Sequence, residues 1–173
     1  MPDNEEVVIF LDQPIRLRPL RAEDRALLED LAHRTDSHDL QMRFFRGFRT
    51  LPPALLDKLI RIDPDRRITL VASRAANGGQ PEILAVARAY ASAEASAELA
   101  LLVRSDLKGK GLGSLMLDRL IARCRSRGLR VLVADVLQAN TRMLRLADKY
   151  GFRRKPAGVG ITRLVLKLDS LAA

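Results

Sequence analysis

The sequence has little cysteine and few aromatic residues. Its 173 residues include one cysteine, no tryptophan, and an aromatic share of 4%. One cysteine excludes an internal disulfide, and a chain so poor in large rings must build its core mainly from Leu, Val, Ile and Ala. Cys124 continues the helical apolar pattern of Leu117, Leu120 and Ile121, which favours core packing over a nucleophilic role.

Other signals of location and metal binding are also missing. The sequence shows no signal peptide and no run of about 18 apolar residues, so we expect a cytoplasmic protein without a membrane partner. The two histidines, His33 and His38, stand apart, and no Cys/His pairing is present. We therefore predict no metal site.

Basic residues exceed acidic ones, giving a formal charge of +9 and a pI near 10.5. Such a charge favours polyanionic partners or a phosphate-rich cofactor. Arginines and lysines are scattered among acids, and no run of five or six like charges resembles a nucleic-acid-binding arm. We do not expect nucleic acid as the partner.

Hydrophobic periodicity predicts one domain over residues 1–173, with 1–12 as a flexible N-terminus. Asn77, Gly78, Gly79 and Pro81 predict a turn that joins two strands into a hairpin. The order of elements predicts an α/β (α+β) fold around a mixed sheet. Strands are expected near 15–17, 66–75, 82–93, 96–104, 129–137 and 160–169, and helices near 27–32, 52–60, 112–127 and 139–151.

Three glycines at alternate positions lie between a strand-like run and a helix-like run in "LVRSDLKGKGLGSLMLDRLI". A glycine-rich turn at a helix N-terminus exposes backbone N–H groups to an anion, and Lys108 and Lys110 add positive charge. The dinucleotide fingerprint fails because Ser114 stands where its third glycine is required. The Walker loop also fails, so neither nucleotide fold fits this anion site.

The segment "KGKGLG" resembles the R/Q-x-x-G-x-G/A signature of the Gcn5-related N-acetyltransferases (GNAT), with Lys108 in place of the usual Arg or Gln. The acid-bearing strand "AELALLVR" before this segment, the strand "LRVLVADVL" after the helix, and "N-x10-GF" from Asn140 to Phe152 stand in the family's order. The resemblance spans nearly the whole chain and is nearest to the acetyltransferase domain of bacterial Pat-type protein lysine acetyltransferases. It implies a GNAT fold with a mostly antiparallel sheet of six to seven strands and about four helices.

This resemblance implies acetyl-CoA as cosubstrate. The backbone amides from Gly109 to Ser114 are expected to bind its pyrophosphate, and strand residues splayed from a neighbour are expected to polarise the thioester oxygen. Asn140 suits both an N-cap and a contact to the CoA arm. The expected cofactor-binding residues are Leu101, Leu102, Val103, Lys108, Gly109, Lys110, Gly111, Leu112, Gly113, Ser114, Asn140 and Met143.

An attacking amine must lose a proton before it strikes the thioester. Glu98 lies in an otherwise apolar strand, where we expect a raised pKa that suits a general base, and the resemblance assigns the acid of this "AE" motif that role. Glu94 is the alternative. Many relatives use a Tyr as general acid at the place of Ala147, and Tyr150 is not expected to reach that spot.

The acceptor is left open. Phe44, Phe45 and Phe48 in "MRFFRGFR" are expected in the core and in the wall of the acceptor site rather than stacked on bases. The first hypothesis is acetylation of a lysine in a protein such as an acyl-CoA synthetase. The second is acetylation of a small amine or antibiotic through an acidic pocket, and the third is a non-catalytic CoA-sensing or nucleic-acid-binding module.

Overall fold

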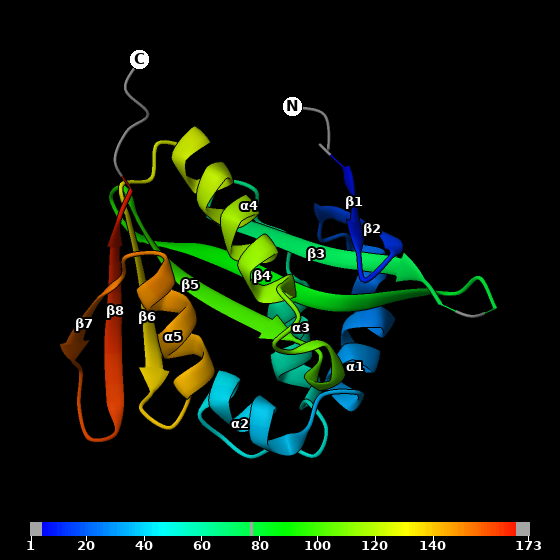
Figure 1. Cartoon of the computed structure of the whole chain (residues 1–173), viewed down its shortest axis with the longest axis horizontal. Coiled ribbons are helices and arrows are strands. Elements are labelled where there is room, and N and C mark those ends of the chain that lie inside the picture. The colour runs from blue at the N-terminus through cyan, green and yellow to red at the C-terminus, as the bar shows by residue number, and fades with distance from the viewer. Residues whose placement is uncertain (1–4, 77, 169–173) are drawn as a thin grey trace.

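The structure is a computed structural model that describes residues 5–76 and 78–168. Its strands form one mixed sheet in the order β1-β2-β3-β4-β5-β6-β8-β7 (Figure 1). The strands are β1 (Glu6–Phe10), β2 (Gln13–Pro19), β3 (Arg67–Ala75), β4 (Pro81–Ala93), β5 (Ser96–Val103), β6 (Val131–Leu137), β7 (Arg153–Pro156) and β8 (Ile161–Lys167).

Neighbouring strands run antiparallel except β5 and β6, which are parallel. The β5–β6 pairing covers Ser96–Glu98 against Val131–Val133 and goes no further within the described residues. The two strands separate beyond that point, so one edge of β5 is open from Leu99 to Val103. This confirms the expected splay in the middle of the sheet.

Helices cover both faces of the sheet (Figure 1). α4 and α5 pack on one face in the larger core, while α1 and α3 pack on the other. Helix α2 lies near β5 and β6, at the point where these strands separate. The helices are η1 (Ala22–Asp24), α1 (Arg25–His33), α2 (Ser37–Phe44), α3 (Pro53–Ile60), η2 (Ser105–Leu107), α4 (Leu112–Ser126) and α5 (Thr141–Lys149).

The predicted fold class is confirmed, with small differences in the count. Eight strands and five α-helices are present among the described residues, against six to seven and about four predicted. The additional helix is α2, and strand β1 lies within the segment 1–12 that we expected to be flexible. That expectation is wrong for Glu6–Phe10, which pair with β2, while residues 1–4 lie outside the described part.

The predicted hairpin is also present, between β3 and β4. Gly78 and Gly79 have φ of 100° and 79°, the left-handed conformation for which glycine is suited. Asn77, also assigned to this turn, lies outside the described residues, as does Asp169 of the last predicted strand. Cys124 is fully buried in the larger core, and burial raises the pKa of its thiol to about 12.

Candidate functional site

The glycine-rich loop enters α4 through two left-handed residues. Gly109 has φ of 73° and Gly111, the N-cap of α4, has φ of 93°. Gly111 provides no side chain to cap the first turn, so amide N–H groups at the positive end of the helix dipole are available to an anion. A Cβ at Gly113 would make ordinary van der Waals contacts with Leu146 and Leu101, at 3.6 and 3.7 Å, so packing does not require glycine at this position.

A cavity of about 390 Å³ lies in front of this loop, and we call it the donor cavity. Most of the expected cofactor-binding residues line it: Leu101, Leu102, Val103, Lys108, Gly109, Gly111, Gly113, Ser114, Asn140 and Met143. Lys110 and Leu112 do not line it, since Lys110 is exposed beside it and the side chain of Leu112 is fully buried in the core.

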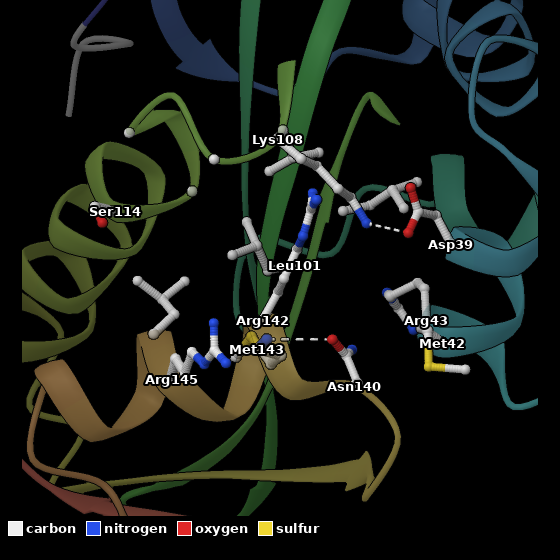
Figure 2. Close-up of a pocket in the computed structure, with 16 residues that line it drawn as sticks. Asp39, Met42, Arg43, Leu101, Lys108, Ser114, Asn140, Arg142, Met143 and Arg145 are labelled. Atoms are coloured by element: carbon white, nitrogen blue, oxygen red, sulfur yellow. Dashed lines mark hydrogen bonds and ion pairs between the residues drawn. The ribbon is translucent and has the colours of Figure 1, made fainter. Parts of the chain in front are cut away.

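Asn140 lies at the start of α5, across the opened β5–β6 gap. Its side-chain oxygen accepts a hydrogen bond from the Met143 backbone N–H at 3.2 Å, so it caps the helix as expected (Figure 2). On the far side of the loop, the Tyr150 hydroxyl donates to the Ser114 carbonyl at 2.9 Å. Tyr150 therefore joins α5 to the first turn of α4, which fits its exclusion as general acid.

Sequence reasoning missed the contribution of α2 and part of that of α5. Asp39, Met42 and Arg43 from α2, and Arg142, Arg145 and Leu146 from α5, complete the donor cavity (Figure 2). The spacing of Arg142 and Arg145 places them on one helix face, a signal that the sequence offered. No comparable local signal indicated α2, because its approach to the loop is a tertiary contact.

Lys108 forms an ion pair with Asp39 of α2, with Nζ and Oδ1 2.6 Å apart (Figure 2). The Ser105 hydroxyl donates to the other oxygen of the same carboxylate at 2.6 Å. Burial opposes ionisation of Asp39, but these hydrogen bonds hold its pKa below the usual value. The pair connects the anion-binding loop to α2, and Asp39 partly neutralises the lysine expected to meet the pyrophosphate.

A second cavity, of about 630 Å³, joins the donor cavity, and we call it the acceptor cavity. The two cavities share Met42, Arg43, Leu101, Asn140 and Met143. Glu98 lines the acceptor cavity only, on β5 directly opposite Tyr90 of β4. A carboxylate therefore lines the acceptor cavity, on the same strand as Leu101, which both cavities share.

The surroundings of Glu98 differ from those expected. Its neighbours Ala97 and Leu99 point into the core, whereas Glu98 points to the opposite face of the sheet and is exposed. The apolar environment inferred from "AELALLV" is thus a property of the other face, and that part of the prediction is wrong. Glu94 lies in the β4–β5 turn and does not line the acceptor cavity, so it is not an alternative base.

The phenylalanines of "MRFFRGFR" are not core residues. Phe45 is 41% exposed and ends α2 with φ of 62°, while Phe44 and Phe48 are half-buried and pack edge to face. The expectation of a core position is wrong because α2 lies near β5 and β6 where these strands separate, rather than on a buried face of the sheet. Phe44 and Phe45 do line the acceptor cavity, as expected for its wall.

The acceptor cavity is basic. Its charged lining residues are Arg43, Lys58, Arg67, Arg88, Glu98 and Asp135. Asp135 is paired with Arg163 at 2.7 Å, which leaves Glu98 as the carboxylate without an ion pair in this lining, among the described residues. The acceptor cavity is therefore not the acidic pocket that the second hypothesis requires for a cationic amine or antibiotic.

The residues that the structure describes contain neither a cluster of metal ligands nor a membrane-spanning helix. No group of three or more His, Cys, Asp or Glu side chains there is arranged to hold a metal ion. Within the same residues, no helix has the length and apolar character needed to cross a membrane.

Comparison with known proteins gives consistent matches. Residues 34–152 match the model of the acetyltransferase (GNAT) family. An acetyltransferase of Pseudomonas aeruginosa is 30% identical over 138 residues, 80% of this chain and 74% of that protein. An L-methionine sulfoximine/L-methionine sulfone acetyltransferase of Pseudomonas paraeruginosa is 38% identical over 88 residues, about half of either chain.

Among solved structures, the GNAT domain of S. lividans PAT superposes with a TM-score of 0.84 and 28% identity, covering 95% of this chain and 97% of that domain. The family match covers more than half of the chain, and the glycine loop, the opened β5–β6 gap and the paired cavities suit the family's cosubstrate. The chain belongs to the GNAT family of acetyltransferases, which use acetyl-CoA for acyl transfer.

Proposed function

We propose that the protein acetylates the side-chain amine of lysine in a protein such as an acyl-CoA synthetase, by direct attack with Glu98 as general base. The observation that carries this proposal is the position of Glu98, which lines the acceptor cavity that adjoins the donor cavity. Similarity to the GNAT domain of S. lividans PAT over 95% of the chain supports the choice of acceptor class. Use of acetyl-CoA supports a cytoplasmic location.

The donor cavity has the features that acetyl-CoA needs. Amides at the start of α4 face the pyrophosphate, and Arg142 and Arg145 add positive charge for phosphate groups. The apolar side chains of Leu101 and Met143 flank the gap in which the pantetheine arm lies between β5 and β6. This arrangement directs the thioester toward the acceptor cavity.

The reaction then needs a proton acceptor and a stabilised oxyanion. Glu98 takes a proton from the ammonium group, through a water molecule, and the free amine attacks the thioester carbon. An N–H group of the opened β5 edge donates to the developing oxyanion. The new C–N bond forms as the C–S bond breaks, and the CoA thiolate takes the second amine proton, directly or through water.

The test is to incubate the protein with acetyl-CoA and candidate acyl-CoA synthetases and to map acetyl-lysine by mass spectrometry. We expect specific sites that depend on the enzyme, and a set of sites unchanged by its omission contradicts the lysine acceptor. Glu98→Gln keeps the size of the side chain and should lower kcat by about 10²- to 10⁴-fold with little change in CoA affinity. An unchanged rate would show that Glu98 is not the base.

A second candidate is acetylation of a free amino acid. Two observations favour it, namely the similarity of half the chain to an L-methionine sulfone acetyltransferase and the basic acceptor cavity. Release of free CoA in the presence of amino acids, with no acetyl-lysine found on proteins, would select this candidate.

A further inference from the structure

The acceptor cavity is lined by arginines from three separate elements. Arg67 comes from β3, Arg88 from β4 and Arg43 from α2. The sheet register explains the convergence, because Arg67 lies opposite Tyr90, which lies opposite Glu98, while Arg88 lies opposite Ala100. Arg88 is therefore a diagonal neighbour of Glu98 on the same face, with their Cβ atoms about 7–8 Å apart.

These arginines differ from the buried arginines elsewhere in the fold. Arg18 binds both oxygens of Asp24 at 2.7 Å, and Arg104 binds Glu82 at 2.9 Å as well as Asp106. By contrast, none of the three cavity arginines has a carboxylate at ion-pair distance within the described residues. Both buried arginines among the described residues are paired with carboxylates, whereas these three half-buried arginines remain available to a ligand.

The lack of a carboxylate at ion-pair distance from these arginines, within residues 5–76 and 78–168, has an electrostatic cost. Burial, together with repulsion from Arg43 and Arg67, lowers the pKa of Arg88 to about 9. Burial lowers the pKa of Arg43 to about 10, although Glu98 acts in the opposite direction. Both groups stay charged near pH 7, and a bound anion would relieve their desolvation and mutual repulsion.

The guanidinium groups of Arg67 and Arg88 are also held in place. Arg88 donates to the Leu59 carbonyl of α3 at 2.5 Å, and Arg67 donates to the Lys58 carbonyl at 2.8 Å. The guanidinium carbon Cζ of Arg67 lies 5.1 Å from the centre of the Tyr90 ring. Its Nε is buried and lacks a hydrogen-bond partner in the described structure, so a donor of this cluster is still unsatisfied.

We propose that Arg43, Arg67 and Arg88 bind a carboxylate carried by the acceptor, so that the preferred substrate is an amine with an acidic group close to it. The inference rests on the proposed acetyltransferase function. Carboxylate binding by the arginines places the neighbouring amine toward Glu98, since Arg88 and Glu98 project from the same face of the adjacent strands β4 and β5. The cluster thus selects the acceptor and Glu98 deprotonates it.

Two kinds of acceptor carry a carboxylate close to the reacting amine. A free amino acid brings its own α-carboxylate, and a protein lysine brings the side chain of an adjacent Asp or Glu. The experiment uses a matched pair for each source, L-methionine sulfone against its carboxamide, and a lysine peptide with neighbouring glutamate against the same peptide with glutamine. We expect kcat/KM for the carboxylate to exceed that for the amide by about tenfold or more in at least one pair.

Arg88→Gln and Arg43→Gln should reduce that preference to about threefold or less, mainly through KM. Arg43 donates no hydrogen bond within the described residues, so it serves as the second variant if loss of the Arg88–Leu59 contact prevents folding. Arg61→Gln is the matched control, because it removes the same charge from an exposed site outside the cavity. The control should keep the preference.

Binding of the same pairs to the CoA complex is measured by calorimetry, which requires no turnover. Equal use and equal binding of carboxylate and amide would overturn the inference while leaving the acetyltransferase function intact. If no acceptor is acetylated, the proposed function fails, and the calorimetric preference and its loss in Arg43→Gln still decide whether the cluster binds carboxylates. The pair that shows the preference identifies the source.

Discussion

Replacing Gly111 by alanine tests whether the loop conformation at the start of α4 is what binds the cosubstrate. Gly111 has φ of 93°, and an added Cβ would meet nothing within 4 Å. The whole penalty is therefore in the backbone, about 1–2 kcal/mol for an L-residue in this region. Without ligand the loop relaxes to avoid the strain, and binding must restore it, so CoA affinity should fall by about 5- to 30-fold.

Gly128→Ala is the matched control. Gly128 follows the other end of α4 with φ of 75°, and a Cβ there also meets open space, so its backbone penalty is similar. We expect Gly128→Ala to lose stability in urea denaturation and to keep its CoA affinity, whereas Gly111→Ala, whose loop relaxes without ligand, should lose CoA affinity in calorimetry. Wild-type affinity in Gly111→Ala, or an equal loss in both variants, would refute the assignment of the loop as the pyrophosphate site.

Three further predictions concern charge and burial. Burial opposes ionisation of Asp24, but hydrogen bonds from Arg18 and from the Arg21 backbone lower its pKa, so its contribution to stability is present above its ordinary pKa near 4 and is lost as the pH falls below it. Asp24→Asn should cost about 3–5 kcal/mol in urea unfolding at pH 7 and less in acid, and a cost independent of pH would contradict this account. Asp39→Asn removes the partner of Lys108 and should tighten CoA binding by about threefold at low salt, whereas weaker binding would mean that the pair itself shapes the site. Cys124, with its pKa raised to about 12 by burial, should react with a thiol reagent only after unfolding, and fast labelling of the native protein would place it outside the core.

The β3–β4 hairpin, the glycine loop and helix α4 were predictable from the sequence because short local patterns specify them. Gly78, Gly79, Gly109 and Gly111 all adopt the positive φ that only glycine accepts readily, and these positions set the hairpin and the loop before α4. The helical apolar periodicity from residue 112 onward predicted a helix over 112–127, which agrees closely with the observed α4. Such features depend on a few adjacent residues, so a single sequence contains their signal.

Other features depend on contacts between distant segments. α2 buries one residue, Leu40, so its apolar period is weak, and β1 is defined by its pairing with β2. The arginine cluster arises from the registers of β3, β4 and β5 and from the position of α2. For Glu98 the sequence could not tell which face was apolar, because strand neighbours alternate between a buried side and an open one.

The most direct test of the account is a crystal structure of the complex with CoA. We predict that the pyrophosphate accepts hydrogen bonds from the amides between Gly109 and Ser114, and that the pantetheine arm lies between β5 and β6. The thiol should then point into the acceptor cavity on the side of Glu98. A pyrophosphate bound elsewhere, or a thiol directed away from Glu98, would contradict the proposed site and mechanism.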